Sequence, residues 1–251
     1  MEKAKFPMPT MRVTQGYNIG THKGTFALDL AGEDTGKDWV LAPFTGTIKK
    51  VLSGTYGNWY WFESNDKVLC ANGEVTKLVA LFGHDDRIRH KVGDVIRQGE
   101  NLCAEGTSGD ATGNHCHLEI GIGSYVGTWY KNGYGIYMLY NSVKPNEYLC
   151  LPDNYTVINT GGYNWIKESM VNEPSSNLKL YLPSDAISWR VYPMNKAPVK
   201  GNECGFLKPS KFGGLVYDIL GWTQPSVTII KTRDFGRVQI YVAKSTGAII
   251  K

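Results

Sequence analysis

Two histidines that stand two residues apart, His115 and His117, are the side chains of this sequence best placed to do chemistry. They open a stretch in which apolar residues occupy every second position, as in a β-strand whose successive side chains point to opposite faces. His115, His117 and Glu119 therefore share one face of the expected strand, and the apolar residues share the other. Two imidazoles directed into one small volume suit a divalent transition metal such as zinc, provided that further ligands come from elsewhere.

Two further candidate ligands lie near the amino terminus. His22 follows a glycine-rich turn, and Asp29 stands inside the apolar run 26–30. A lone carboxylate in a buried strand is costly unless it is paired or bound to a metal. The two residues are therefore either the missing ligands or, alternatively, a surface-loop histidine and a strand-end aspartate.

The remaining histidines differ in their surroundings. His84 stands at the exit of the apolar strand expected over 78–83, where a histidine is presented at the rim of a sheet. His90 lies between Arg89 and Lys91 and has the pattern of a solvated loop residue. The chain has no His-Glu-x-x-His helix, which excludes a thermolysin-like site.

The composition favours strands over helices. The chain has 251 residues, 42% of them hydrophobic, which is enough for one large domain or two ordinary ones. Aromatic residues make up 12% and there are 29 glycines, a balance typical of strands joined by tight turns. We therefore expect an all-β protein.

Cysteines and apolar runs indicate the compartment. The five cysteines are odd in number and scattered, which favours reduced core thiols over a disulfide framework. The first residues show no signal peptide, and no run of about 18 apolar residues could insert into a membrane. We expect a protein made in a cytoplasm.

The charge is unevenly distributed along the chain. The formal net charge is +4, but residues 178–251 alone carry 11 Lys and Arg against four Asp and Glu. A basic module beside a neutral one predicts a polyanionic partner, the alternative being a solvated basic face. No RNA- or DNA-binding motif accompanies the basic residues, so nucleic acid is not the expected partner.

A change of composition divides the chain into two expected domains. Pro152, the pair Gly161-Gly162 and the polar stretch 172–177 are typical of a linker. We therefore predict a first domain over 1–150, a linker over 151–177 and a second domain over 178–251. The second domain consists of short β-rich runs separated by turn residues, which predicts a small barrel.

Five motifs of the first domain resemble, in the same order, those of the lysostaphin-type zinc metallopeptidases that cut peptide crosslinks of bacterial cell walls. The motifs are His22…Asp29, Leu81-Phe-Gly-His84, Val92-Gly-Asp-x-Ile-x-x-Gly-Glu100, Gly106-Thr-Ser-Gly109 and His115-Cys-His117. The resemblance covers roughly residues 10–150 and implies the antiparallel β-sheet fold of the lysostaphin/LytM type. Many members have three residues between the first histidine and the aspartate. Here six intervene, so the His22 loop is expected to bulge.

The resemblance also implies the roles of the site residues. One zinc ion would be bound by His22, Asp29 and His117, with a fourth position open to water, as in catalytic zinc sites. His115 would act as general base and His84 would hydrogen-bond the oxyanion, although the sequence does not separate these two roles. Both suit an imidazole, which titrates near neutrality.

Further residues are candidates for contacts with the metal surroundings or the substrate. Asn114 precedes the site strand, and Glu119 either supports the metal ligands or faces solvent. Tyr134 belongs to an aromatic region after that strand, which either walls a substrate groove or packs on the sheet.

The second domain resembles the bacterial SH3-like wall-binding modules of lysins, most clearly in the run 236–242. Its aromatic residues Trp189, Tyr192 and Trp222 would bind a glycan or a crosslink peptide if exposed, and are otherwise core residues.

These expectations describe a zinc endopeptidase that cuts peptidoglycan in the stem peptide or the crosslink, with anionic wall polymers as additional partners. Without an export signal, a monomeric phage endolysin is expected, held in the host cytoplasm until it reaches the cell wall. The alternative is a non-enzymatic wall-binding or hydrolase-activating protein. Degenerate relatives of that kind lose zinc ligands, whereas this chain keeps every one.

Overall fold

The computed structural model describes residues 1–171, 178–194 and 196–251. Within them the chain forms two compact units, the first made of residues 1–71 and 75–168 and the second of residues 72–74 and 169–251. Strands dominate both units, which confirms the all-β fold class. The described helical segments are η1 (Gly20–His22), α1 (Pro145–Tyr148), η2 (Glu168–Met170), η3 (Pro209–Phe212) and η4 (Lys244–Thr246).

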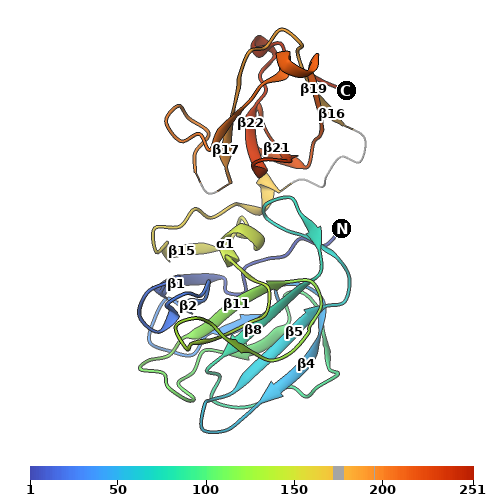
Figure 1. Ribbon diagram of the computed structural model, residues 1–251. Helices are drawn as coiled ribbons and strands as arrows, with labels where there is room; N and C mark the ends of the chain where they lie inside the picture. The colour runs from blue at the N-terminus through green and yellow to red at the C-terminus, as the bar shows by residue number, and fades with distance from the viewer. Residues whose placement is uncertain (172–177, 195) are drawn as a thin grey trace. The chain divides into compact units, whose positions relative to one another are not determined.

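One large sheet organises the first unit. Among the described residues it has nine strands in the order β15-β1-β2-β11-β8-β5-β4-β9, with β14 beside β11, and Figure 1 shows β2, β11, β8, β5 and β4 in succession. All neighbours are antiparallel except β1 and β15. The strands are β1 (Thr10–Gln15), β2 (Leu28–Ala31), β4 (Gly46–Leu52), β5 (Trp59–Ser64), β8 (Leu78–Gly83), β9 (Val95–Ile96), β11 (Cys116–Ile122), β14 (Ser142–Val143) and β15 (Thr156–Asn159).

Short two-stranded sheets complete the first unit. They pair β3 (Trp39–Leu41) with β10 (Asn101–Ala104), β6 (Val68–Leu69) with β7 (Val75–Thr76), and β12 (Tyr130–Lys131) with β13 (Tyr137–Met138). Within the described residues no helix has the length and apolar character needed to cross a membrane.

Both faces of the central strands are covered, which is why β5 and β8 read as continuous apolar runs. One face forms the main core, which includes Tyr60, Phe62, Ala80, Phe82 and Leu118. The opposite face carries a smaller cluster made of Trp61, Val79, Leu81 and Leu139. Each fully buried Leu or Phe side chain contributes about 1.5–3 kcal/mol, so the two clusters hold the sheet rigidly between them.

Strand pairing places four residues in one row across the sheet. Asp29 of β2 pairs with His117 of β11, and His117 pairs on its other side with Gly83 of β8. Gly83 in turn pairs with Trp59 of β5. Because residues directly opposite each other on neighbouring strands project to the same face, this row brings the chemical side chains of distant segments together.

Part of the expected linker belongs to the first unit. β15 pairs with β1, and Leu151 is buried in the main core together with partly buried aromatic residues of the same segment. The reason is the β-forming run Thr156-Val-Ile, which the surrounding Pro, Gly and Asn residues obscure in the sequence. The stretch 172–177 of that linker lies outside the described residues.

The second unit contains a five-stranded and a three-stranded antiparallel sheet. The first has the order β18-β17-β22-β21-β20 and the second β19-β16-β23 around one core that includes Leu180, Val191, Ile230, Val238 and Ile240. The strands are β16 (Lys179–Leu182), β17 (Trp189–Pro193), β18 (Gly205–Leu207), β19 (Leu215–Asp218), β20 (Gly221–Gln224), β21 (Val227–Thr232), β22 (Gly236–Tyr241) and β23 (Ile249–Ile250). The SH3-like character of this unit stays a prediction.

All five cysteines lie among the described residues, and none of them forms a disulfide. Four of them are buried, as expected for core residues, and Cys204 is exposed.

Candidate metal centre and active site

An ordered turn delivers His22 to the sheet. The His22 amide donates to the Ile19 carbonyl at 2.8 Å, and the Thr25 hydroxyl donates to the His22 carbonyl at 2.9 Å. Gly24 follows with a φ of 76°, which a residue with a Cβ rarely adopts. The additional residues between His22 and Asp29 therefore form a defined turn, and the His22 side chain is buried.

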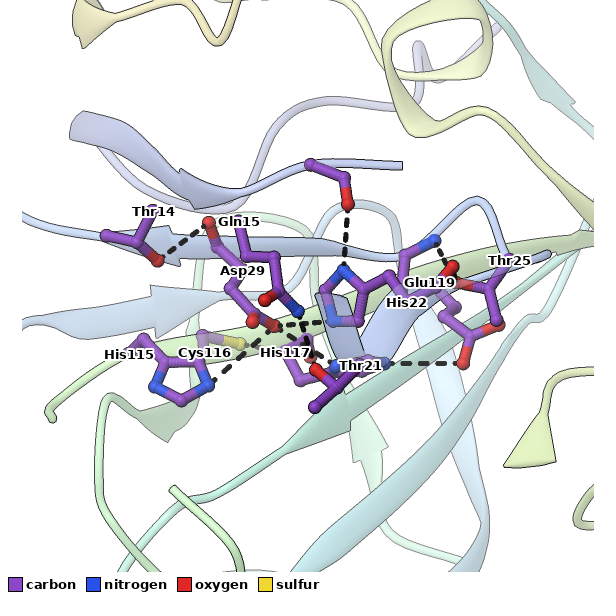
Figure 2. A network of polar contacts seen from close by, with 12 residues as sticks. Thr14, Gln15, Thr21, His22, Thr25, Asp29, His115, Cys116, His117 and Glu119 are labelled. Carbon is purple, nitrogen blue, oxygen red and sulfur yellow. Dashed lines mark hydrogen bonds and ion pairs between the residues drawn. The ribbon is translucent and has the colours of Figure 1, made fainter. Parts of the chain in front are cut away.

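The three side chains predicted as metal ligands lie together. His22 Nε2 is 3.2 Å from Asp29 Oδ1, and His117 Nδ1 is 3.1 Å from the same oxygen. One ligand atom from each of the three lies within 4.8 Å of those of the others, so a single ion can contact all of them (Figure 2). Two nitrogens and one carboxylate oxygen are a donor set that zinc accepts.

Hydrogen bonds on the outer side of each imidazole fix its tautomer. His22 Nδ1 lies 3.1 Å from the Gly16 carbonyl, and His117 Nε2 lies 3.3 Å from Glu119 Oε1. Because a carbonyl or a carboxylate can only accept, both outer nitrogens carry a hydrogen. The inner nitrogens, His22 Nε2 and His117 Nδ1, donate to Asp29 when they are protonated, and in the neutral ring the lone pair of the inner nitrogen is free to bind a cation beside Asp29. This orientation by a second hydrogen-bond partner is typical of metal-binding histidines. The residues therefore fit zinc.

The buried carboxylates favour a positive charge between His22, Asp29 and His117. Burial alone would lower the pKa of His117, but hydrogen bonds to Asp29 and Glu119 outweigh it and raise the pKa to about 10. Burial would raise the pKa of Asp29, yet hydrogen bonds from His117 and His22 hold it well below its usual range. A proton or a divalent cation can supply the charge that the buried carboxylates require.

Glu119 is part of the centre and does not face solvent. It is 1% exposed, and besides His117 it accepts hydrogen bonds from the Leu139 amide at 3.0 Å and the Ser142 hydroxyl at 3.4 Å. Figure 2 shows the resulting chain from Asp29 through His117 to Glu119. The sequence left open whether Glu119 contacts the candidate ligands or faces solvent, and in the structure it is buried and bonded to the candidate ligand His117.

The two predicted catalytic histidines lie beside the ligands. His115 Nε2 is 3.7 Å from Asp29 Oδ1, and the His84 and His115 ring centroids are 4.7 Å apart. Each ring donates from Nδ1 to a backbone carbonyl at 2.8 Å, of Gly113 for His115 and of Ser108 for His84. Nε2 of each ring is thus the nitrogen available for proton transfer.

His84 is held in an unusual state. Its backbone φ of 76° is uncommon for a residue with a Cβ, and such strain is concentrated at functional sites. Burial lowers the pKa of His84 to about 4, and the neighbouring His117 and His115 act in the same direction. The ring is therefore neutral at neutral pH.

A cavity of about 290 Å³ adjoins the centre. His84 and His117 form part of its lining, and most of the rest is aromatic: Tyr56, Trp59, Trp129 and Tyr137. Trp129 and Tyr137 belong to the aromatic region that the sequence offered either as a wall of a substrate groove or as a loop packed on the sheet, whereas Tyr56 and Trp59 were not among the predicted contacts. The sequence signal that could have indicated Trp59 is the alternation Trp59-Tyr-Trp61 in the strand paired with the one that precedes His84.

Two predicted substrate residues of the first unit lie away from that cavity. The Asn114 side chain donates to the Thr35 carbonyl at 2.9 Å and so fastens a loop. Tyr134 is 62% exposed and its ring lies 4.8 Å from Lys23 Nζ, beside the turn that carries His22. Neither residue lines the cavity next to the metal ligands.

In the second unit the predicted aromatic residues differ in exposure. Tyr192 is buried, contrary to an exposed role, on β17, which is an interior strand of its sheet between β18 and β22. Trp189 and Trp222 are half-buried against the core, and Trp189 Nε1 donates to the Tyr241 carbonyl at 2.9 Å. Trp189 and the edge of Tyr192 line a cavity of about 320 Å³.

Comparisons with known proteins identify similar phage proteins. No protein-family model matches the chain. The chain is 52% identical to the endolysin of Listeria phage A511 over 77 residues, which are 31% of this chain and 23% of that protein. It is 29% identical to morphogenesis protein 1 of Bacillus phage B103 over 183 residues, which are 70% of this chain and 47% of that protein. The chain thus spans about a quarter and about half of the length of these two relatives.

Among solved structures, lysostaphin from Staphylococcus simulans, an antimicrobial peptidase, is similar over 96% of this chain and 95% of its own. The identity is 16% and the TM-score 0.41.

Proposed function

We propose that this protein is a zinc-dependent endopeptidase that hydrolyses peptide bonds of bacterial peptidoglycan, as a phage endolysin. The observation that carries this proposal is the centre in which His22, Asp29 and His117 direct three donor atoms at one point, with two further histidines beside it. The likeness to the endolysin of Listeria phage A511 supports the phage assignment.

The residues of the centre divide into ligands and proton carriers. His22 Nε2, Asp29 Oδ1 and His117 Nδ1 would hold the ion. Zinc bound there would act as a Lewis acid and lower the pKa of a bound water to about 7. His115 and His84, with their Nδ1 atoms occupied by carbonyls, handle protons through Nε2.

His115 is the proposed general base, because its Nε2 lies next to the ligand carboxylate. The attacking water loses its proton to this nitrogen, which later returns it to the leaving amine. His84 starts neutral and becomes a hydrogen-bond donor at Nε2 by taking up a proton from solvent as negative charge develops at the attacked carbonyl; in that form it stabilises the oxyanion, and it returns the proton to solvent when the product leaves. The reverse assignment uses the same two nitrogens, and the pH profiles of the two single alanine variants distinguish the assignments.

The second unit is proposed to hold the enzyme on the wall. Its excess of basic residues suits anionic wall polymers, and the cavity beside Trp189 offers an aromatic surface for a glycan or a crosslink peptide. The enzyme would act as a monomer that stays in the host cytoplasm until its release to the cell wall.

A non-enzymatic wall-binding or activating protein is the competing reading. Such a protein needs no complete donor set and no histidine beside it. Here both are present, with the outer nitrogen of each ligand histidine bonded to an acceptor.

Metal analysis joined to a turbidity assay tests the proposal. The full-length protein should contain about one zinc per chain and clear a suspension of purified Gram-positive walls. A chelator should remove both the metal and the lysis, and added zinc should restore them. Wall clearance that persists in fully metal-free protein, or zinc-loaded protein that clears no wall, would reject the peptidase assignment.

Mass spectrometry of the released fragments then identifies the bond. New amino termini within the peptide part of the wall are the expected products, whereas new reducing sugar ends would indicate a glycosidase.

A further inference from the structure

A tryptophan lies over a glycine next to the metal centre. Trp59 and Gly83 are directly paired, and a Cβ on Gly83 would lie 2.3 Å from Cζ3 of the indole. Gly83 thus leaves space for the Trp59 ring to lie beside His117 and His84, at centroid distances of 5.2 Å and 5.0 Å. Trp59 Nε1 donates to the Tyr56 carbonyl at 2.7 Å, which fixes the ring.

A second tryptophan extends the aromatic surface that Trp59 forms beside the centre. We call this surface, made of Trp59, Trp129 and Tyr137, the aromatic wall. Trp129 contacts Trp59 edge to face at a centroid distance of 5.7 Å and Trp61 at 4.9 Å, and Tyr137 lies 5.6 Å from it. Trp61 Nε1 donates to the carbonyl of Thr128, the residue before Trp129, at 2.8 Å. The loop that carries Trp129 is therefore fastened to the sheet, and the wall is preorganised.

The size of the cavity limits its occupant. At about 290 Å³ it lies at the lower end of ligand pockets, which span roughly 300–1,000 Å³. A single long side chain can fill it, whereas glycine would leave it empty. Methylene groups pack well on aromatic faces, as the stems of lysine side chains do on apolar surfaces.

The charges around the cavity favour a basic end group. Asp110 lines the cavity, is exposed, and makes no hydrogen bond or ion pair with any described residue. Glu119, also in the lining, is already engaged by three donors.

We propose that this cavity binds the side chain of the substrate residue next to the scissile bond, and that the residue is a diamino acid. Its methylene chain would lie against Trp59, Trp129 and Tyr137, and its terminal amine would reach Asp110. This proposal rests on the peptidase function proposed above and assigns the class of substrate to it.

Three synthetic peptides test the proposal on the zinc-loaded, full-length enzyme. They reproduce the bond identified from wall fragments and differ only in the residue assigned to the cavity, which is lysine, norleucine or glycine. We expect kcat/KM to fall in that order, with norleucine above glycine by roughly tenfold or more. Because Asp110 is exposed, lysine should exceed norleucine by about two- to fivefold.

Two variants separate the contribution of the Asp110 carboxylate from that of the aromatic wall. Asp110→Asn should abolish the preference for lysine over norleucine, while the ratio of the norleucine to the glycine rate is kept. Trp129→Ala should bring lysine and norleucine down towards glycine. Asp66→Asn and Tyr130→Ala, which alter exposed residues of the same unit outside the cavity, should keep the wild-type order. Zinc content and circular dichroism check that each variant is folded.

The outcomes distinguish this proposal from the one on which it rests. A glycine peptide cleaved as fast as the lysine peptide, or an unchanged lysine preference in Asp110→Asn, overturns the cavity assignment while leaving the peptidase intact. Failure to cleave both walls and peptides rejects the peptidase function itself. If only walls are cleaved, tryptophan fluorescence titration of His115→Ala with the peptides must give the same ranking of affinities, and equal affinities overturn the assignment.

Discussion

The two units of this protein treat charge in opposite ways. Among the described residues, every buried Asp, Glu and His side chain belongs to the first unit: His22, Asp29, Glu63, His84, Asp85, Glu105, His117 and Glu119. The second unit buries polar side chains that carry no charge, namely Asn72, Thr228, Thr232 and Gln239. Burying an ionisable group is costly unless it is paired, so the first unit accepts a cost that the second avoids.

Within the first unit, the partners of a buried carboxylate distinguish support from chemistry. Glu105 accepts hydrogen bonds from the backbone amides of Gly32 and Asp38, which fixes two loops. Asp29 and Glu119 are instead bonded to imidazoles, whose protons can leave in favour of a metal ion. Buried charge alone therefore does not locate the site. The site is indicated by a buried carboxylate that is bonded to groups able to give up a proton and bind a cation instead.

The largest effect is expected from loss of a ligand. His117→Ala should remove the zinc and reduce lysis to the uncatalysed background, because two donors do not retain the ion. Metal analysis and wall turbidity measure the two losses. His90→Ala, which alters an imidazole outside the centre, is the matched control and should change neither. A lytic, zinc-containing His117→Ala protein would contradict the ligand assignment.

Loss of the proposed base should separate binding from chemistry. His115→Ala should keep its zinc while kcat falls by about 10²–10⁴-fold, the usual contribution of a general base. Zinc content and initial rates on a peptide substrate give the two values. Retention of the wild-type rate in this variant would show that His115 has no such role.

Loss of the carboxylate behind a ligand should have a smaller effect. Glu119→Gln should weaken zinc binding by about 10–100-fold, because the charged acceptor that orients the His117 ring is replaced by a neutral amide. Competition with a chromogenic chelator measures the affinity. Glu63→Gln serves as the control, since Glu63 is buried in the same unit but is bonded to Lys77 and the Tyr125 amide. Equal losses in both variants would mean a general effect on folding.

The buried His84 should make the stability of the first unit depend on pH. Its pKa is about 4, against 6.5 for a free imidazole, so the unfolded chain takes up a proton at a pH where the folded ring stays neutral. Lowering the pH from 6.5 to 4 should therefore destabilise the fold, by on the order of 2 kcal/mol.

Denaturant titrations of metal-free protein at several pH values give the free energy of unfolding at each pH, and therefore its slope between pH 6.5 and pH 4. His84→Gln, which lacks the titrating ring, should show a flatter dependence over the same range. A slope identical to that of the wild type would contradict the neutral, buried state of His84.

The smallest effect concerns the basic unit. Wall binding should weaken by a few fold as salt is raised, because interactions between exposed charges are screened. Cleavage of a small, uncharged peptide should change less, since the buried centre is shielded. Pull-down on purified walls and peptide assays at matched salt make the comparison, and an equal salt dependence of the two would argue against a basic wall-binding surface.

The clustering of the three predicted ligands could be expected from the sequence, because strand periodicity and the order of motifs are local properties. His115 and His117 share a face through their spacing, and Asp29 stands in an apolar run, where a carboxylate requires a charged partner or a metal. Trp129 and Tyr137 belong to the aromatic region that the sequence offered as a groove wall. Trp59 was missed because its place beside the centre depends on register across three strands and on the missing Cβ of Gly83.

Two further features, one strand pairing and one buried side chain, could not be predicted from the sequence. The pairing of β15 with β1 joins segments about 145 residues apart, and Tyr192 is buried on β17, an interior strand of its sheet. Neither feature has a local sequence signal, because both depend on which strands become neighbours.

Polar and apolar side chains alternate between the two faces of β11, and this alternation couples folding to the assembly of the candidate metal centre. A one-residue slip against β8 would turn Cys116 and Leu118 towards the substrate and push both histidines into the apolar core, which hydrophobic burial forbids. The donor atoms are therefore aligned by the same event that closes the core, before any ion arrives. The protein should thus fold in zinc-free medium, and it should then bind added zinc without having to unfold and refold.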